Sequence, residues 1–235
     1  MWVFAGGMQR AGSTLQYQMA GGIVEHCGLG RRVTWHDPGD HERVLADDGG
    51  DELLVFKSHE LTPAIRRAVD AGRGRCLYIY RDLRDVISSM MDKFGCRFTP
   101  EQAATTARSL MAAHAAWTSI PDTHVARYED VINDMATEIN SLARYLGAAV
   151  DAPFAARLAA DLAPARQAER IRQAAQSDTM VRVSESIAYH PDTLLHENHL
   201  LDGRPGRYRD RLSSELVEAV EGQAAQWLRE HGYAV

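Results

Sequence analysis

The first fifteen residues constrain this chain most strongly, because they predict a strand, a glycine-rich turn and a helix in direct succession. The apolar run from Trp2 to Ala5 is typical of a buried strand, and a turn follows from Gly6 to Gly12. Apolar residues at helical spacing then begin at Leu15. The first N–H groups of such a helix have no partner within it and carry a partial positive charge, so this unit predicts an anion site.

The turn resembles the phosphate-binding loop of nucleoside-triphosphate enzymes, with one difference. Gly7 and Gly12 occupy the two glycine positions, and Thr14 occupies the hydroxyl position. The position of the phosphate-binding lysine holds Ser13, and the one cation of the turn is Arg10. We therefore expect the turn to bind an anion other than the triphosphate of an ordinary kinase. A plain strand-to-helix turn is the alternative interpretation.

Composition limits the partners and the compartment. The net charge is −6 and no long basic run is present, which argues against nucleic acid or an anionic membrane as partners. The three cysteines, Cys27, Cys76 and Cys96, form neither a disulfide framework nor a zinc pattern. No apolar stretch approaches the length of a membrane span, and no secretory signal is visible. We expect a cytoplasmic protein without a membrane partner.

Strands and helices alternate along the rest of the chain. Apolar runs at 53–57, 75–80 and 123–126 predict three further strands, with helical patterns between them. This alternation favours an α/β fold with a central, mainly parallel sheet, helices on both faces and a P-loop-like nucleotide-binding core. We expect a single domain over residues 1–235, in which residues 178–211 form a mobile loop beside the substrates.

Two later segments with helical periodicity are long, and each is interpreted as one continuous helix. Periodic apolar residues predict one helix over 128–146, and an alanine- and arginine-rich stretch predicts another over 151–176. Arg84 and Asp85 are interpreted as helix-start charges that form a local pair.

Chemically active residues follow the predicted strands. Lys57 and His59 come at the end of one strand, and Arg81 follows the next. Residues two apart on a strand point to the same side, so Lys57 and His59 are expected to face together. Because the carboxyl ends of parallel strands meet at one edge of a sheet, these residues and the glycine turn are expected to share one crevice.

Five segments, taken in order, resemble the sulfotransferases that use 3′-phosphoadenosine 5′-phosphosulfate (PAPS). They span nearly the whole chain and lie at 9–15, 55–59, 80–89, 125–130 and 203–209. The resemblance implies transfer of a sulfuryl group from PAPS to a hydroxyl or amine of a small-molecule acceptor. The product would be adenosine 3′,5′-diphosphate (PAP), and no metal would be needed.

The resemblance also implies residue roles. The catalytic residues would be His59, Lys57 and Arg10. The 5′-phosphosulfate would be held by the loop residues Arg10, Ala11, Gly12, Ser13, Thr14 and Leu15. The 3′-phosphate would be held by Arg81 and Ser89, the adenine would lie near Tyr128, and the late glycine motif would contribute Gly203 and Arg204. Two positions depart from the family pattern: Leu15 replaces a tryptophan, and Leu201 and Asp202 replace basic residues.

The chemistry of these side chains suits sulfuryl transfer. An imidazole titrates near neutral pH, so His59 can accept the acceptor's proton. The planar fork of Arg10 and the loop N–H groups can stabilise the charge that develops on the leaving phosphate.

Two other functions stay open, namely a small P-loop kinase and a non-catalytic nucleotide-binding protein on the same fold. Asp82 could serve the kinase as an acidic magnesium ligand. His190, His196 and His199 lack the spacing of a metal site and are read as polar loop residues. The acceptor is not encoded in any readable motif, and a homodimer stays open.

Overall fold

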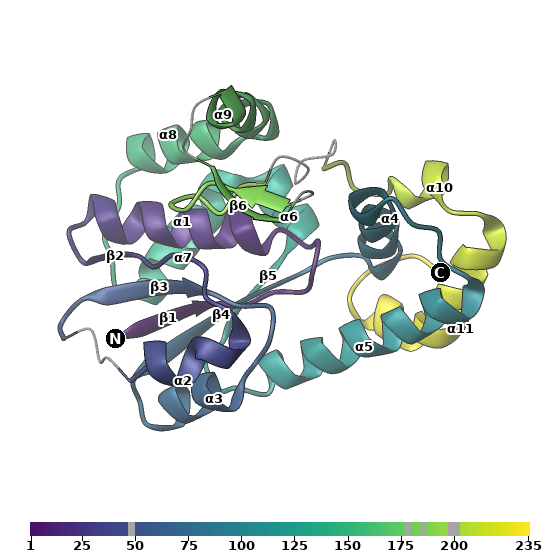
Figure 1. Cartoon of the computed structure of the whole chain (residues 1–235), viewed down its shortest axis with the longest axis horizontal. Helices are drawn as coiled ribbons and strands as arrows, with labels where there is room; N and C mark the ends of the chain where they lie inside the picture. The colour runs from purple at the N-terminus through teal and green to yellow at the C-terminus, as the bar shows by residue number, and fades with distance from the viewer. Residues whose placement is uncertain (47–49, 177–179, 185–186, 197–202) are drawn as a thin grey trace.

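The structure, a computed structural model, has a parallel sheet at its centre (Figure 1). It describes residues 1–46, 50–176, 180–184, 187–196 and 203–235. Five strands pair in parallel in the order β2-β3-β1-β4-β5. Their bounds are β1 Trp2–Ala5, β2 Gly30–Arg32, β3 Leu53–Lys57, β4 Gly74–Tyr80 and β5 His124–Arg127. The parallel α/β sheet predicted from the alternation of elements is confirmed.

Helices connect the strands and cover the sheet (Figure 1). Between β1 and β5 they are α1 Ser13–His26, α2 His41–Val44 after a 3-10 turn at Pro38–Asp40, α3 Pro63–Asp70, α4 Leu83–Phe94 and α5 Pro100–Thr118. After β5 they are α6 Tyr128–Asn133, α7 Met135–Leu146, α8 Ala152–Leu162, α9 Pro164–Gln176, α10 Tyr208–Arg211 and α11 Ser214–Glu230. Among the described residues, no helix combines the length and the hydropathy needed to cross a membrane.

Alternate residues of β1 enter two separate apolar cores. Trp2 and Phe4 pack with buried residues of α3, α5 and α11. Val3 and Ala5 point to the opposite face and pack with buried residues of α1 and α7. Figure 1 shows α1, α7 and α8 on one side of the sheet and α2 and α3 on the other. Both faces are therefore covered, as the sequence predicted.

The strand order reverses at β1. Strands β2 and β3 lie on one side of it, and β4 and β5 lie on the other. Ala5, the last residue of β1, is in register with Lys57 of β3 and Leu77 of β4. In open α/β sheets, ligands bind outside the carboxyl ends of the strands at such a reversal. The sheet thus brings the glycine turn to the same edge as Lys57 and the residues that follow Tyr80.

Both long helices predicted for the second half of the chain are interrupted. The first breaks at Asp134, whose φ of −145° is not helical and whose carboxylate accepts a hydrogen bond from the Thr137 N–H. The second breaks at Ala163, which is extended (φ −57°, ψ 143°) because it precedes Pro164. In each case a local helix-start signal overrides the apolar periodicity.

The segment after α9 contains short elements that the sequence did not reveal. Strands β6 (Val181–Ser184) and β7 (Ile187–Tyr189) pair in antiparallel fashion, and Tyr189 also bridges to His196. Strands of three and four residues are too short for alternation to be recognised. The mobility expected for residues 178–211 stays a prediction, and residues 185–186 and 197–202 lie outside the described part of the chain.

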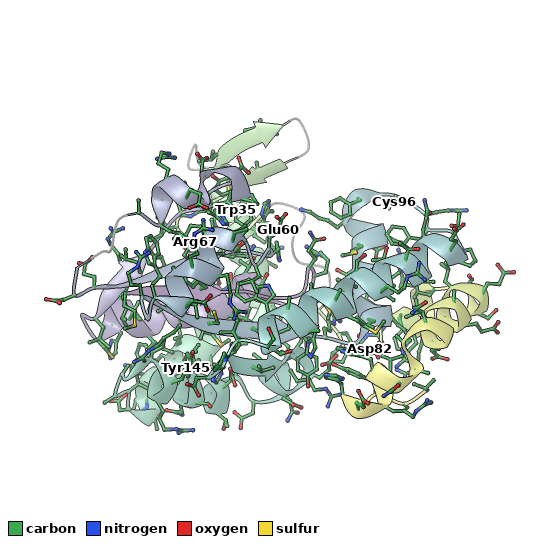
Figure 2. All side chains as sticks on the ribbon, turned by 90° about the horizontal axis from the view of Figure 1, so that it is seen from below. Trp35, Glu60, Arg67, Asp82, Cys96 and Tyr145 are labelled. Atoms are coloured by element: carbon green, nitrogen blue, oxygen red, sulfur yellow. The ribbon has the colours of Figure 1, made fainter. Side chains whose placement is uncertain are left out.

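A buried ion-pair network joins the start of α4 to α11. Arg84 is 2% exposed and donates hydrogen bonds to the Asp82 carboxylate (Nη2–Oδ2 2.7 Å) and to Glu221 of α11. Figure 2 shows Asp82 beside this C-terminal helix. The predicted local pair of Arg84 with Asp85 is wrong, because Asp85 pairs with Arg81 instead.

Substituting Arg84→Leu is expected to lower the free energy of unfolding by about 3–5 kcal/mol, because the buried carboxylate of Asp82 loses its partner. Urea unfolding followed by circular dichroism measures this loss. Arg66→Leu is the matched control, because Arg66 forms an exposed pair with Asp70 and its loss is expected to cost about 0.5 kcal/mol. Similar small losses in both variants would contradict a buried network at Arg84.

Candidate active site

A cavity of about 250 Å³ opens at the carboxyl edge of the sheet. Most of the residues assigned to the site from the sequence line it, namely Arg10, Gly12, Ser13, Thr14, Leu15, Lys57, His59, Arg81, Ser89, Tyr128 and Gly203. Ala11 and Arg204 were also assigned to the site but do not line the cavity. Residues far apart in the sequence thus meet in one place.

Close packing around the turn after β1 requires glycine. Gly12 has a left-handed φ of 94°, and a Cβ there would lie 2.9 Å from the Tyr128 ring. A Cβ at Gly7 would lie 2.8 Å from the Cβ of Ser13. Gly12 precedes α1 and provides no side-chain cap, so the first N–H groups of that helix are left for a ligand.

Two further loop residues have different places. Ala11 is fully buried, and its N–H donates to the Met8 carbonyl at 3.1 Å, so it shapes the turn. Thr14 is 7% exposed, and its Oγ1 has no hydrogen-bond partner among the described residues. Buried hydroxyl groups are rarely left unpaired, which makes Thr14 a candidate ligand of an anion in the cavity.

Arg10 connects the turn to α4. Its backbone is left-handed (φ 61°), and its Nε donates to the Ser89 hydroxyl at 3.0 Å. Burial, followed by the positive charge of Arg81, lowers the pKa of Arg10 to about 10. A bound anion would relieve both effects. Ser89, assigned from the sequence to the 3′-phosphate, here contacts the arginine assigned to the 5′-phosphosulfate.

Lys57 and His59 face the cavity together, as the two-residue spacing predicted. His59 Nδ1 lies 3.1 Å from the Gly7 carbonyl oxygen, which can only accept, so Nδ1 carries the proton. Nε2 is then left with a lone pair and lies 3.3 Å from Lys57 Nζ. Burial, followed by the charge of Lys57, lowers the pKa of His59 to about 3. The imidazole is therefore neutral, and its pKa lies well below the near-neutral value expected from the sequence, because the ring is buried and its unprotonated Nε2 lies beside the ammonium group.

Lys57 itself has a strongly altered pKa. Burial, followed by the charge of Arg10, lowers the pKa of Lys57 to about 8. Its Nζ lies 5.1 Å from the centre of the Trp35 ring. Trp35, shown with Glu60 in Figure 2, was not singled out from the sequence.

Trp117 of α5 holds the backbone at His59. Its Nε1 donates to the His59 carbonyl at 3.3 Å, and the residue is 1% exposed. A Cβ at Gly6 would lie 2.9 Å from the indole, so a glycine is needed for this close approach. Because α5 lies far along the chain, only the burial expected of a tryptophan in a helical pattern could have indicated this contact.

Arg81, which follows β4, also lines the cavity. Its Nη2 donates to Asp85 Oδ2 at 3.2 Å and to the Arg204 carbonyl at 2.9 Å. Its guanidinium lies 4.4 Å from the centre of the Tyr128 ring, and the Tyr128 hydroxyl donates to the Gly203 carbonyl at 2.8 Å. The late glycine motif thereby lies against Arg81.

Asp85 holds the late glycine motif in place through hydrogen bonds to its backbone. Its side chain is fully buried and accepts backbone hydrogen bonds from Gly206 at 2.7 Å and Tyr208 at 2.8 Å, besides the one from Arg81. The Arg204 side chain pairs with Asp210, so this residue reaches Arg81 through its carbonyl. The sequence offered no signal for these roles.

The cavity is also lined by residues of two segments that were expected from the sequence to form the acceptor pocket, 94–98 and 180–207; they are Phe94, Leu195, His196 and Arg207. Lining residues that the sequence did not indicate are Gln9, Gln18, Asp85, Lys93, Ile132, Leu162, Pro164 and Gln167. Of the three late histidines, His196 lines the cavity, His190 does not, and His199 lies outside the described residues. In the part of the chain that the structure describes, no group of three His, Cys, Asp or Glu side chains is placed to hold a metal ion.

Comparisons with known proteins show which solved structures share the fold of this chain. No family model and no curated protein matches the chain. The mouse sulfotransferase SULT7A1 with PAP is similar at a TM-score of 0.72 and 12% identity, over 97% of this chain and 83% of that one. Retinol dehydratase with androsterone and the inactive cofactor PAP is similar at a TM-score of 0.60 and 16% identity, over 100% of this chain and 82% of that one. The complex of retinol dehydratase with retinol and PAP is similar at a TM-score of 0.56 and 15% identity, over 100% of this chain and 83% of that one. The resemblance to PAPS-dependent sulfotransferases is confirmed at the level of the fold.

Proposed function

We propose that this protein is a PAPS-dependent sulfotransferase that acts on a hydroxyl or amine of a small molecule. The observation that carries the proposal is a neutral histidine in a cavity that is also lined by the cations Arg10, Lys57 and Arg81. His59 Nε2 is unprotonated and lies 3.3 Å from Lys57, and both line the same cavity as the N-terminus of α1. A base and an electrostatic stabiliser are the two groups that sulfuryl transfer needs.

In the proposed reaction, the acceptor oxygen or nitrogen forms a bond to sulfur while the bond between sulfur and the 5′-phosphate oxygen breaks. His59 Nε2 takes the proton that the acceptor loses. Lys57 and Arg10 offset the negative charge on the transferred group and on the leaving phosphate. The products are the sulfated acceptor and PAP, so atoms and charges balance without a metal ion.

The donor would be held at two places in the cavity. The N–H groups from Gly12 to Leu15 and the Thr14 hydroxyl would bind the 5′ end. Arg81 would bind the 3′-phosphate with its planar fork, at the end of the cavity that lies against the late glycine motif. Structural neighbours that carry PAP together with androsterone or retinol support a nucleotide site beside a small-molecule acceptor site.

The kinase alternative is weakened by the environment of Asp82. Its carboxylate accepts two side-chain hydrogen bonds from Arg84 and one from the Arg84 backbone. A carboxylate engaged in this way is a poor ligand for magnesium. Ser13 also stands where a kinase loop has lysine. The non-catalytic alternative predicts nucleotide binding without any role for His59.

Substituting Arg81→Ala is expected to weaken PAP binding by about ten- to a hundredfold, because charge-assisted hydrogen bonds to the 3′-phosphate are lost. Binding of AMP, which lacks that phosphate, is expected to be unchanged. Isothermal titration calorimetry of both nucleotides measures the difference, and AMP is the internal control. Failure of the wild type to bind PAP, together with magnesium-dependent binding of ATP, would contradict the sulfotransferase and favour the kinase.

PAP affinity is expected to decrease as the pH rises above about 8. Lys57 in the free protein loses its proton there, since its pKa is lowered to about 8, whereas the bound anion would keep it protonated. At a pH between the pKa of Lys57 in the free protein and its higher pKa in the complex, binding must therefore be accompanied by uptake of a proton. Calorimetry in buffers of different ionisation enthalpy detects this uptake. Lys57→Met is expected to bind PAP more weakly at pH 7 and to lack the decrease. An unchanged decrease in that variant would assign the titration to another group.

Substituting His59→Ala is expected to lower the transfer rate by about 10²- to 10⁴-fold, because the general base is lost. The assay follows labelled sulfuryl transfer from PAPS to a panel of phenols, alcohols and amines. PAP binding by the same variant is expected to stay within about threefold of wild type, since the base does not hold the nucleotide. A variant that retains full transfer would remove His59 from the mechanism.

A further inference from the structure

Both lysines of the chain line the cavity, and one of them has no role in the reaction described above. The chain contains two lysines, Lys57 and Lys93, and both are lining residues. Among the residues that the structure describes, no hydrogen bond or ion pair involves the side chain of Lys93. Burial, followed by the positive charge of Arg10, lowers the pKa of Lys93. A half-buried ammonium group near another cation calls for an anionic partner from outside the protein.

Helix α4 shows where Lys93 lies relative to the proposed nucleotide site. Asp85, Ser89 and Lys93 follow one another at intervals of four residues, so they share one face of α4, and all three line the cavity. Asp85 pairs with Arg81, and Ser89 accepts the hydrogen bond from Arg10. At the usual helical rise, the Lys93 backbone lies about 6 Å beyond Ser89 and about 12 Å beyond Asp85. Along α4, Lys93 therefore comes after both positions proposed for the phosphates of the donor.

His196 connects Lys93 with the proposed base. Burial and then the charge of Lys93, ahead of that of Lys57, lower the pKa of His196 to about 4. His196 in turn contributes to the lowered pKa of His59. Because electrostatic effects weaken with distance, one imidazole is within reach of both lysines and of His59. The ammonium group of Lys93 is thus near the place where an acceptor must meet the base.

Apolar surface adjoins this lysine. Phe94, the last residue of α4, lines the cavity and is nevertheless 62% exposed. Leu195, next to His196 in the chain, also lines the cavity. An exposed phenylalanine beside a cation that has no partner suits a molecule with both an apolar body and an anionic group.

We propose that the acceptor is an apolar molecule that carries an anionic group besides the hydroxyl or amine that is sulfated, and that Lys93 binds this anionic group. Phe94 packs against the apolar part, and His59 meets the nucleophile. Lys93 is then a specificity-determining residue, because a neutral acceptor of the same shape leaves its ammonium group unpaired. This inference rests on the proposed function, since it names the class of acceptor for the same site.

The transfer assay compares acceptors of one shape that differ in charge. The probes are 4-hydroxyphenylacetate and 3-(4-hydroxyphenyl)propionate, each beside its carboxamide, with the full-length protein and PAPS. Wild type is expected to use the carboxylates with a kcat/KM about tenfold higher than that of the carboxamides, mainly through a lower KM. Tyramine, which carries an ammonium group on a similar phenol, is expected to be the poorest acceptor.

Three variants separate a specific ion pair from the general positive charge of the cavity. Lys93→Met is expected to lose the preference for carboxylates, and Lys93→Arg is expected to keep it. Arg97→Met is the matched control and is expected to keep the preference, because Arg97 is exposed and does not line this cavity. PAP binding by all three variants is expected to stay within about threefold of wild type, since Lys93 acts on the acceptor.

A binding measurement makes the test independent of turnover. Because the chain has two lysines, protein labelled with ¹³C-lysine gives two sets of side-chain signals in NMR spectra, and Lys93→Met identifies those of Lys93. In the PAP-saturated protein, a carboxylate probe is expected to shift the Lys93 signals, and its carboxamide is expected to leave them in place. If no probe is sulfated, this shift alone decides: its presence supports the inference, and its absence overturns it.

The remaining outcomes distinguish this inference from the proposed function. Equal kcat/KM values within both pairs, or a carboxylate preference that survives in Lys93→Met, would overturn the role of Lys93 while leaving the sulfotransferase intact. A loss of PAP affinity of more than about tenfold in Lys93→Met would assign the lysine to the nucleotide and overturn the inference as well. Failure of wild type to bind PAP would instead overturn the proposed function, and this inference with it.

Discussion

The enclosure of three cations, Arg10, Lys57 and Arg81, in one cavity is the constraint on which the rest of the structure depends. Burial and the neighbouring positive charges lower the pKa values of Arg10 and Lys57, so the free protein holds these cations at a cost. A buried carboxylate, Asp85, partly offsets this cost at Arg81. The rest of the fold supplies the rigidity that keeps the cations together. An anionic ligand is the natural complement of such an arrangement, because it stabilises each of the three charges at once.

The sheet converts this constraint into a defined geometry. With β1 at the reversal of strand order, the turn after it and the end of β3 must lie at one edge. The Gly7 carbonyl can then orient the His59 ring, while the helix that starts at Ser13 points its free N–H groups at the same place. Trp117, which belongs to the same apolar core as Trp2 and Phe4, holds the backbone of His59 through a hydrogen bond. Base, cations and helix start are therefore held by three different elements with little freedom to move.

Much of this architecture follows from local sequence. The alternation of strands and helices predicts the parallel sheet, and the spacing of Lys57 and His59 predicts that both face one crevice, because each depends on residues close together in the chain. Contacts between residues far apart in the chain could not be predicted from the sequence. Arg84 has carboxylates on both sides in sequence, and only the packing of α11 against α4 brings Glu221 to it and leaves Asp85 to Arg81. The carbonyl role of Arg204 and the contact of Trp117 with His59 depend on tertiary structure in the same way.

The placement of two indoles has an optical consequence. Of the four tryptophans in the chain, Trp117 donates a hydrogen bond to the backbone of His59, and Trp35 lies 5.1 Å from the ammonium of Lys57. A positive charge near an indole ring alters its emission, and so does a change in its hydrogen bond. The protein thus carries its own fluorescent reporters on both sides of the base. Occupancy and protonation of the cavity can be followed in the unlabelled chain in real time.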